Sequence, residues 1–412
     1  MNTLLIVLVT VGPLLQSAPF DQGQAAAYFR EAEALCLREG GRLWGVSLCG
    51  PMVLADPIAK AIATNQPAPD APRPASLGYA SAALNWGGTR WSTYAWQHVQ
   101  AAEGHTRGRL MMHELFHRIQ PELGLMTADG DNGHLDTFEG RYWLQLEWRA
   151  LAEALRASGA ERTAAIRDAL TFRRARRDRF AGAAENERLE EVREGLAQYT
   201  GTVAAVETRA AAEADAIVQL AQFATIPSYI RSFPYPSGAA YGLLLDAYSP
   251  DWRRRISAAD DLGTMLTIAA RVDPIADATE AEARYGGPQL RASEEAREAQ
   301  HEARVVELRR RFVEGPVLIL PARSGASSSS NGLTDIPDAG TIVTTYRVAA
   351  DWGSLDAAQV LRSPGRSRII VPAPASIDGA SLTGDGWTLT LAPGWVIRPA
   401  ARAGDYAVVR ER

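Results

Sequence analysis

The chain has 412 residues, which is too long for one compact core, so we expect two or three domains. Its composition, 46% hydrophobic and 22% charged, is ordinary for a folded soluble protein. The formal net charge of -5 is small, so the charge gives no reason to expect nucleic acid as a partner.

Residues 1–18 have the pattern of an export signal. Leu4 to Val9 is an unbroken apolar run, Gly12 and Pro13 end it, and Ala18 offers a small residue for cleavage. No Lys or Arg precedes the run, which departs from the usual signal. The run is far shorter than the roughly 20 apolar residues of a spanning helix, and no later segment is long and apolar enough. We therefore expect a periplasmic or secreted protein without a membrane span.

Two cysteines, Cys36 and Cys49, are present. An even number in an exported chain permits one disulfide. Cys36 lies late in an expected helix, Ala25 to Arg38, and Cys49 lies in an expected apolar strand, Leu43 to Leu54. A helix that folds back on its following strand could bring the two sulfurs together, so we predict the bond. Two buried, unbonded side chains are the alternative.

Residues 19–107 combine this helix with strand-like runs. Thr89 to Trp96 places aromatic and β-branched residues among polar ones, which is typical of a half-exposed strand. The prolines between Gln66 and Pro72 indicate a loop. We interpret this region as an N-terminal mixed α/β part of the functional unit.

Residues 108–314 are predicted to be mainly helical, because Ala, Leu, Arg and Glu dominate and apolar residues recur about every 3.6 positions. The arginines between Arg173 and Arg179 form a basic run that we interpret as a solvated helix face. Asp136 and Glu139 fit an N-cap and its capping box, at the start of a helix that continues from Tyr142 to Leu155.

Residues 315–412 have a different character. An apolar run from Val317 to Leu320 is followed by a Ser/Gly-rich stretch, Ser324 to Gly332, that predicts a loop. Short β-type runs follow, such as Thr341 to Tyr346 and Trp387 to Leu391. We expect a small C-terminal β domain, arranged as a sandwich, and an α+β fold class for the whole chain.

The segment Arg109 to Gln120 reads RLMMHELFHRIQ, and the Pro121 that follows suits a helix ending there. His113 and His117 are four residues apart, so both imidazoles project from one side of this helix. Glu114 lies beside that side, where its carboxylate can reach a metal-bound water. This is the HExxH pattern of zinc metallopeptidases.

A catalytic zinc site needs a third protein ligand and an open position for water. The metzincin pattern would continue with Gly at 120 and His at 123, but this chain has Gln120 and Leu123, so that class is excluded. The remaining candidates are His134, Asp136 and Glu194. The expected capping role already explains Asp136, and His134 has the setting of a loop residue that faces substrate.

Glu190 to Tyr199 resembles the second ligand helix of the gluzincins, which often reads N-E-G-x-A-x-Y. The matching residues are Glu194, Gly195, Ala197 and Tyr199, with Arg193 where Asn is common. The resemblance implies that Glu194 is the third zinc ligand and that the small residues let this helix pack closely on the HExxH helix. Glu194 follows His117 by 77 positions, more than in the aminopeptidase N family, so we expect a helical insertion within residues 142–180.

Tyr235 to Ala240, YPSGAA, precedes an apolar helix that we expect from Tyr241 to Ala247. The segment resembles the Y-x-K-G-A segment of the aminopeptidase N family, with Ser237 in place of Lys. The resemblance implies that the Tyr235 hydroxyl stabilises the transition state, with Tyr241 as the reserve candidate. The family's G-x-M-E-N strand has no counterpart, because Leu77 to Trp96 contains no Glu. Exopeptidase specificity is therefore not implied.

Together these motifs imply a zincin-like core with Zn²⁺ held by His113, His117 and Glu194, and a peptide or protein as substrate. The metal-activated water would attack the peptide bond, with Glu114 as general base. Gln198, one helical turn after Glu194, would orient a ligand histidine. The alternative is a zincin-fold binding or scaffold protein with a non-catalytic metal site, although such a site needs no general base. A metal-free helical interaction protein is a further alternative.

Overall fold

The computed structural model describes residues 19–411, except 57–58, 75, 79–80, 323–326 and 378. The expected export signal lies outside the described residues. The chain divides into two compact units. Unit 1 contains the residues up to His134, Trp143–Ala224 and Ile230–Ala281; unit 2 contains Leu135–Tyr142, Thr225–Tyr229 and the residues from Glu282 onward.

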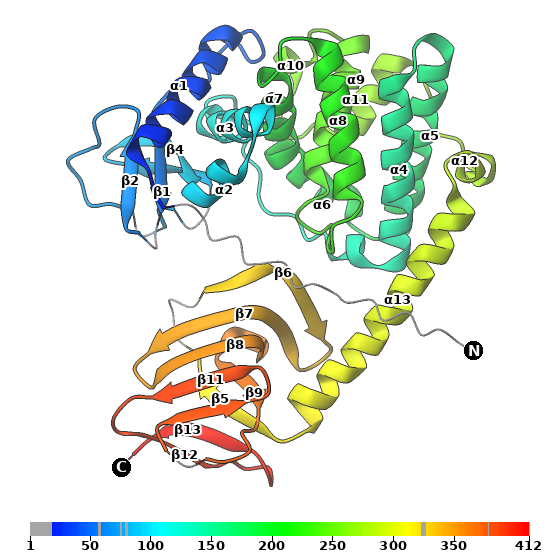
Figure 1. Ribbon diagram of the computed structural model, residues 1–412. Helices are drawn as coiled ribbons and strands as arrows, with labels where there is room; N and C mark the ends of the chain where they lie inside the picture. Colours follow the sequence, from blue (N-terminus) through cyan, green and yellow to red (C-terminus); the bar gives the residue numbers. More distant parts are fainter. Residues whose placement is uncertain are drawn as a thin grey trace, which may run out of the picture. The chain divides into compact units, whose positions relative to one another are not determined.

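Unit 1 begins with helix α1 (Gln22–Glu39) and a four-stranded mixed sheet (Figure 1). The strands are β1 (Met52–Asp56), β2 (Ala61–Thr64), β3 (Ala82–Trp86) and β4 (Thr89–Ala95). Their order is β2-β1-β4-β3, with β1 and β4 parallel and the other pairs antiparallel. The side chain of Asp21 caps α1 by accepting a hydrogen bond from the Gln24 amide, and Gly40 ends the helix in the left-handed conformation. The expected N-terminal helix and mixed sheet are thus present.

The strand expected from Leu43 to Leu54 is wrong for most of its length, because β1 begins only at Met52. Before β1, the guanidinium of Arg118 donates hydrogen bonds to the carbonyl oxygens of Ser47, Leu48 and Cys49, at 3.0, 3.2 and 2.8 Å. These hydrogen bonds satisfy the three carbonyl groups and hold this apolar segment as a loop.

The predicted disulfide between Cys36 and Cys49 is confirmed. The two Cα atoms lie 5.2 Å apart, and Cys36 is completely buried in the last turns of α1. The bond therefore ties the end of α1 to the loop that Arg118 holds.

The rest of unit 1 is helical, as the sequence predicts. In chain order its helices are α2 (Trp96–Ala101), α3 (Gly104–Ile119), η1 (Gly133–Asp136), α4 (Phe138–Arg156), α5 (Gly159–Arg177), α6 (Ala183–Glu190), η2 (Glu191–Gly195), α7 (Leu196–Ala204), α8 (Arg209–Phe223), α9 (Pro234–Tyr248), α10 (Trp252–Arg255), α11 (Leu262–Ala270) and α12 (Thr279–Arg284). The first residues of α4 and the last of η1 and α12 belong to unit 2. Helices α4 and α5 occupy the residues where helices are expected, and none of the described helices is long and apolar enough to cross a membrane.

The cap of α4 differs from the prediction by one residue. Thr137 accepts a hydrogen bond from the Gly140 amide at 3.1 Å, as an N-cap side chain does. Asp136 instead ends η1 and accepts a hydrogen bond from the Tyr229 amide at 2.7 Å. The predicted capping role of Asp136 is therefore wrong.

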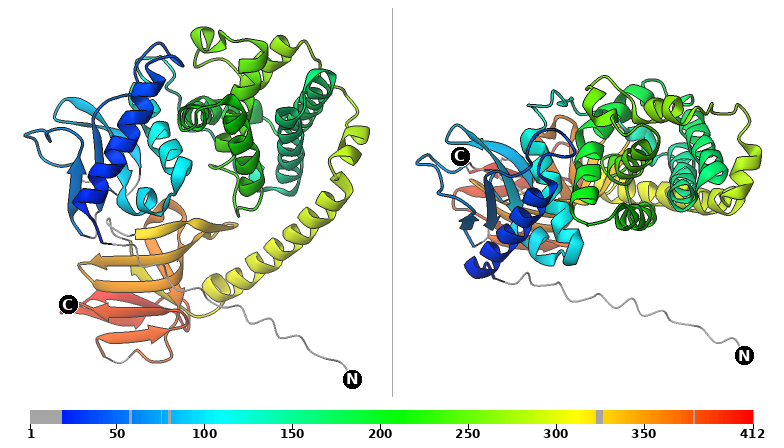
Figure 2. Two further views of the ribbon diagram at one scale, coloured as in Figure 1. Left: turned by 45° about the horizontal axis from the view of Figure 1, so that its top comes forward. Right: turned by 90° about the horizontal axis from the view of Figure 1, so that it is seen from above.

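Unit 2 contains the long helix α13 (Gly287–Arg309), the turn η3 (Arg310–Glu314) and a mixed sheet, whose strands run from yellow to red in Figure 2. The strands are β5 (Val317–Pro321), β6 (Ser327–Ile336), β7 (Gly340–Ala350), β8 (Gly353–Arg362), β9 (Arg368–Pro372), β10 (Ser381–Gly384), β11 (Trp387–Leu391), β12 (Trp395–Pro399) and β13 (Tyr406–Arg410). The short turn η4 (Pro364–Arg366) joins β8 to β9.

This sheet differs from the expectation in two respects. Its strands form one continuous mixed sheet and not the two sheets of a sandwich, because β8 pairs with β11 along Gly353–Ala357 and with β9 at Leu361 and Arg362. The predicted Ser/Gly-rich loop is a strand from Ser327 onward, since β6 pairs with β7, although with register shifts. Side chains of this region, among them Trp352 and Trp387, pack together in one buried hydrophobic core.

Candidate metal centre

Helix α3 presents the HExxH residues as the sequence predicts. Its apolar side chains, among them Met112, Leu115 and Phe116, are completely buried and fix the helix in the core of unit 1. His113 and His117 point the same way, and their Nε2 atoms lie 3.0 Å apart. The predicted i, i+4 pairing of the two imidazoles is therefore present.

Glu194 completes the group. Its Oε2 atom lies 3.3 Å from the Nε2 atom of His113 and 3.3 Å from that of His117. Among the residues that the structure describes, these three form the one group of His, Cys, Asp or Glu side chains that could hold a metal ion. Of the other two candidates, His134 contacts Glu187 at 2.9 Å and Asp136 accepts from a backbone amide.

The helix that carries Glu194 has an unusual first turn. Residues Glu191–Gly195 form a π-helical turn between α6 and α7. Such single turns are often found at functional sites, because the extra residue rotates the side chains that follow it. The sequence pattern predicts a helix here and gives no sign of this turn.

The distances fit a tetrahedral metal ion. Bonds of about 2.0–2.1 Å at tetrahedral angles place neighbouring ligand atoms about 3.3 Å apart. The three separations in this group are 3.0, 3.3 and 3.3 Å. The donor atoms of His113, His117 and Glu194 thus already have the spacing that one small ion requires.

A glutamine sets the orientation of each histidine. Nδ1 of His113 lies 3.0 Å from Oε1 of Gln198, and Nδ1 of His117 lies 2.8 Å from Oε1 of Gln120. Because a carboxamide oxygen only accepts, each Nδ1 carries the hydrogen, and in a neutral ring the lone pair is then on Nε2. In the neutral rings, both Nε2 lone pairs are directed at the point where His113, His117 and Glu194 converge.

The expected contact of Gln198 with one of the two histidines is present. The sequence does not predict the corresponding contact of Gln120. Its amide nitrogen donates to the carbonyl oxygens of Leu125, Val192 and Arg193, which fixes its oxygen toward His117. The local signal was an amide side chain three residues after a ligand on the same helix, a spacing at which side chains meet.

His117 and Glu194 form an ion pair within this group. Burial lowers the pKa of His117, but the hydrogen bond with Glu194 and the charges of Glu114 and Glu194 outweigh burial and raise it to about 9. Burial raises the pKa of Glu194, but its contacts with His113 and His117 hold that pKa well below the usual range. A metal ion would take the place of the proton on His117.

Glu114 is buried beside this group, and its Oε2 atom has no hydrogen-bond partner. Burial raises its pKa, and the charges of His113 and His117 only partly oppose this. A buried carboxylate oxygen without a partner is costly, so such an atom in a folded protein indicates a function or an absent ligand. It is free to accept a proton.

Tyr235 lies against the metal ligands, in the first turn of α9 and not before the helix as the sequence suggests. Its ring stacks on His113, with centroids 5.4 Å apart and planes 3° apart, and on Phe223 at 5.9 Å and 15°. Burial and the negative charges of Glu194 and Glu114 raise the pKa of Tyr235 well above its usual value, so its hydroxyl keeps its proton. Tyr241 instead donates to Glu147, at 2.7 Å.

The expected close packing of Gly195 on the HExxH helix is wrong. A Cβ atom on Gly195 would approach Gly238 of α9, with 3.1 Å to its Cα atom. The close approach to α3 occurs at Gly201, whose Cβ position would overlap the carbonyl oxygen of Arg109. The two glycines therefore let the ligand helix contact two different neighbours.

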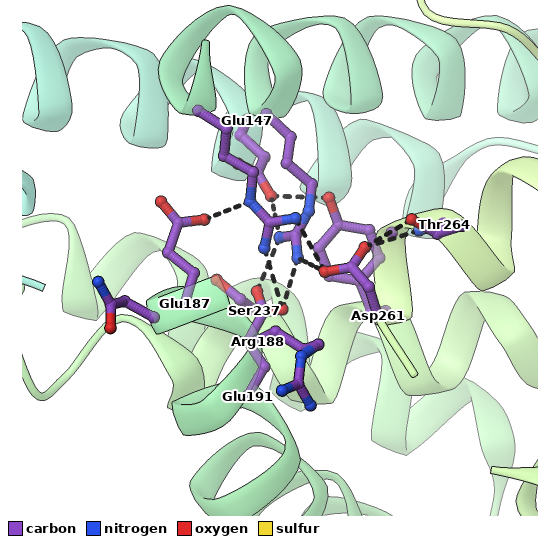
Figure 3. Close-up of polar contacts among 12 residues, drawn as sticks. Glu147, Glu187, Arg188, Glu191, Ser237, Asp261 and Thr264 are labelled. Atoms are coloured by element: carbon purple, nitrogen blue, oxygen red, sulfur yellow. Dashed lines mark hydrogen bonds and ion pairs between the residues drawn. The ribbon is translucent and has the colours of Figure 1, made fainter. Parts of the chain in front are cut away.

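A buried ion network supports the turn that carries Glu194 (Figure 3). Glu191, in this turn, accepts two hydrogen bonds from the guanidinium of Arg173, at 2.7 and 2.5 Å. Arg173 also contacts Glu147 of α4 and Asp261, the N-cap of α11. The network therefore joins the turn that carries Glu194 to three other helices.

The same network corrects the interpretation of the arginine run as a solvated face. Arg176 is completely buried, and Arg173 is 4% exposed. Arg176 donates two hydrogen bonds to Glu187, at 2.8 and 2.9 Å, and one to Glu147 at 2.5 Å. Composition alone does not reveal this, because the paired carboxylates lie on other helices.

Comparison with protein-family models, with curated proteins and with solved structures finds no match for this chain.

Proposed function

We propose that this protein is an exported zinc peptidase of the gluzincin type, with a zincin-like core. The observation that carries the proposal is the site itself. Two imidazole nitrogens and one carboxylate oxygen converge at metal-ligand spacing, beside the partner-free oxygen of Glu114. Two histidines and a glutamate are a known ligand set of catalytic zinc. Ferrous iron also uses two histidines and one carboxylate, but the HExxH spacing favours zinc.

Zinc in such a site acidifies a water ligand and polarises a carbonyl group. The contribution of this chain begins with Glu114, whose raised pKa suits a group that accepts a proton from the attacking water and returns it to the leaving amine. The two glutamines hold the imidazoles in the tautomer that leaves Nε2 free for the metal.

Tyr235 supplies a hydrogen-bond donor beside the ligands. Its ring stacks on His113 and on Phe223, which restricts its position, and its hydroxyl hydrogen-bonds Glu194 in the metal-free protein. Because its pKa is raised, it remains protonated at neutral pH and can donate to the oxyanion that forms during attack on a peptide carbonyl.

A scaffold with a non-catalytic metal site explains less of this arrangement. Such a protein needs the three ligands but has no use for a buried carboxylate that lacks a partner, which only destabilises the fold. The disulfide between Cys36 and Cys49 supports a periplasmic or secreted location, because disulfides persist in oxidising compartments.

The test compares the wild-type protein with Glu114→Gln and with a matched control, Glu122→Gln, which changes an exposed glutamate near the same helix end. Zinc is measured by elemental analysis, and hydrolysis is measured on an unfolded protein substrate. We expect about one zinc per chain in all three, with hydrolysis lowered at least about 100-fold in Glu114→Gln alone. Zinc binding without hydrolysis by the wild type would favour the scaffold.

A further inference from the structure

Behind His113, a line of polar side chains extends away from the metal ligands through α7 and α8. Gln198 accepts from His113 through its oxygen and donates through its nitrogen to Oε1 of Gln219, at 2.6 Å. Gln219 in turn donates to Oδ2 of Asp215, at 2.9 Å, and to Thr202 at 3.0 Å. Gln198, Gln219 and Asp215 are all nearly or fully buried.

The line ends at a charged group on the HExxH helix. Nη1 of Arg109 donates to both oxygens of Asp215, at 2.6 and 2.7 Å, and Nε2 of His105 lies 3.1 Å from Oδ1. Arg109 precedes His113 by one helical turn on α3. The chain of contacts therefore leaves α3 at His113 and returns to it at Arg109, passing through two other helices.

The direction of every hydrogen bond in this chain is determined by its charged end. An ionised Asp215 only accepts, so the nitrogen of Gln219 must face it. The oxygen of Gln219 then faces Gln198, whose nitrogen must donate, and the oxygen of Gln198 is left to face His113. The ring nitrogen that meets this oxygen must carry the hydrogen, so the metal-facing nitrogen of His113 carries the lone pair.

We propose that Asp215 and Gln219 are positioning residues for the metal site, which fix the tautomer of His113 through Gln198. This inference rests on the metal site of the proposed function and extends it to residues that touch neither metal nor substrate. Partners of ligand histidines typically change metal affinity 10–100-fold when they are lost. If these residues served only in packing, zinc affinity would not depend on the direction in which the hydrogen bonds run.

The direction of the chain can be reversed by substitution, and this gives the test. In Gln198→Glu, the second carboxylate oxygen faces Gln219 and forces its amide to turn, so that its oxygen meets the oxygen of Asp215. Adding Asp215→Asn supplies an amide nitrogen at that position and restores a donor for every acceptor. Asp215→Asn should therefore lower zinc affinity about 10-fold in the wild-type background and raise it in the Gln198→Glu background.

Zinc affinity is measured by competition with a chelator, and the visible absorption of the cobalt-substituted protein reports the geometry at His113. Asp246→Asn is the matched control. Asp246 also accepts from an arginine, Arg253, and from Tyr199 of α7, but it takes no part in the line of hydrogen bonds between His113 and Arg109. It should have the same effect on zinc affinity in both backgrounds. Circular dichroism and unfolding of the metal-free variants check that each one folds.

A second pair of substitutions tests the proposal without Gln198→Glu. Gln219→Leu interrupts the line of hydrogen bonds, so adding Asp215→Asn to this variant should no longer change zinc affinity. If Asp215→Asn changes zinc affinity equally in every background, the positioning role of Asp215 and Gln219 is refuted, although the peptidase proposal stands. If Asp215→Asn raises zinc affinity in the Gln198→Glu background but the wild type hydrolyses no peptide, the positioning role stands and the peptidase proposal fails. A wild-type protein that binds no zinc overturns both.

Discussion

Replacing Arg176 with methionine tests the ion network that supports the ligand turn. The arginine side chain is completely buried and forms three hydrogen bonds to Glu187 and Glu147, both also fully buried. Methionine fills a similar space, but Glu187 and Glu147 both lose the positively charged partner that they share. Removing one partner of a buried ion pair costs about 3–5 kcal/mol.

The remaining contacts place the expected loss at the lower end of this range. Arg177 still donates to Glu187 at 2.8 Å, and Arg173 still lies 3.3 Å from Glu147. We therefore expect Arg176→Met to lower the free energy of unfolding of unit 1 by about 3 kcal/mol. Arg156→Met is the control, because Arg156 pairs with Glu153 on an exposed part of α4 in the same unit, and its loss should cost less than about 1 kcal/mol.

The loss should also depend on pH. Burial raises the pKa of Glu187, but the charges of Arg176 and Arg177 outweigh burial and hold it well below the usual range. A carboxyl group with a lowered pKa stabilises the fold above its unfolded pKa of about 4.3, and this contribution is lost as the pH falls further. The gap between wild type and Arg176→Met should thus be complete at pH 7 and shrink below about pH 4.

Urea unfolding followed by hydrogen-exchange mass spectrometry of peptides from α5 and α6 measures this loss separately from unit 2. A variant as stable as the wild type would show that the network is not a source of stability. A gap that stays constant in acid would show that the loss arises from packing and not from charge.

Two further predictions concern the metal. His113→Ala and His117→Ala should each lose zinc, since two remaining protein ligands are too few to hold it; undiminished zinc in elemental analysis of either variant would contradict the site. Because the pKa of His117 is raised to about 9 in the metal-free protein, zinc must displace a proton at neutral pH. Zinc affinity in a non-binding buffer should therefore rise about 10-fold per pH unit up to about pH 9 and then level off, and an affinity independent of pH between 6 and 8 would contradict the ion pair.

The parts of the site that sequence could predict are those that depend on local geometry. His113 and His117 meet because a four-residue spacing on a helix requires it. Glu194 was selected from three candidates because its neighbours resemble a known ligand helix, and Gln198 follows from the same helix by one turn. The pairing of the histidines and the position of Gln198 need only the period of a helix, whereas the choice of Glu194 rests on the family resemblance.

The parts that sequence could not predict depend on contacts between distant helices. Asp215, Gln219 and Phe223 recur every four residues on α8 and face the site, but no local pattern shows which helix they meet. The signal that could have been used is a polar stripe at helical spacing in a segment otherwise rich in alanine. The burial of Arg176 likewise depends on carboxylates of other helices, which composition cannot locate.

The contact between Gly195 and Gly238 depends both on a local residue type and on a distant helix, because the absence of side chains at these two positions determines how closely the helices approach. A Cβ atom at position 238 would overlap the backbone of Gly195, the residue directly after the ligand Glu194. Backbone cannot move aside as a flexible side chain can, so in Gly238→Ala the ligand turn must shift away from α9. Such overpacking costs about 1–3 kcal/mol of stability.

Gly238→Ala should also weaken zinc binding, because the carboxylate of Glu194 moves with its turn while both histidines stay on α3. We expect zinc affinity to fall by about 10-fold or more, the scale at which supporting contacts affect metal sites. Gly23→Ala in the first turn of α1 is the matched control, since its nearest neighbour, an oxygen of Asp21, would lie 3.3 Å away. Both substitutions add one methyl group to a helical glycine, but only the one at position 238 would overlap backbone of another helix. Equal zinc affinity in the two variants would mean that Glu194 is positioned by the ion network alone, without the contact to α9.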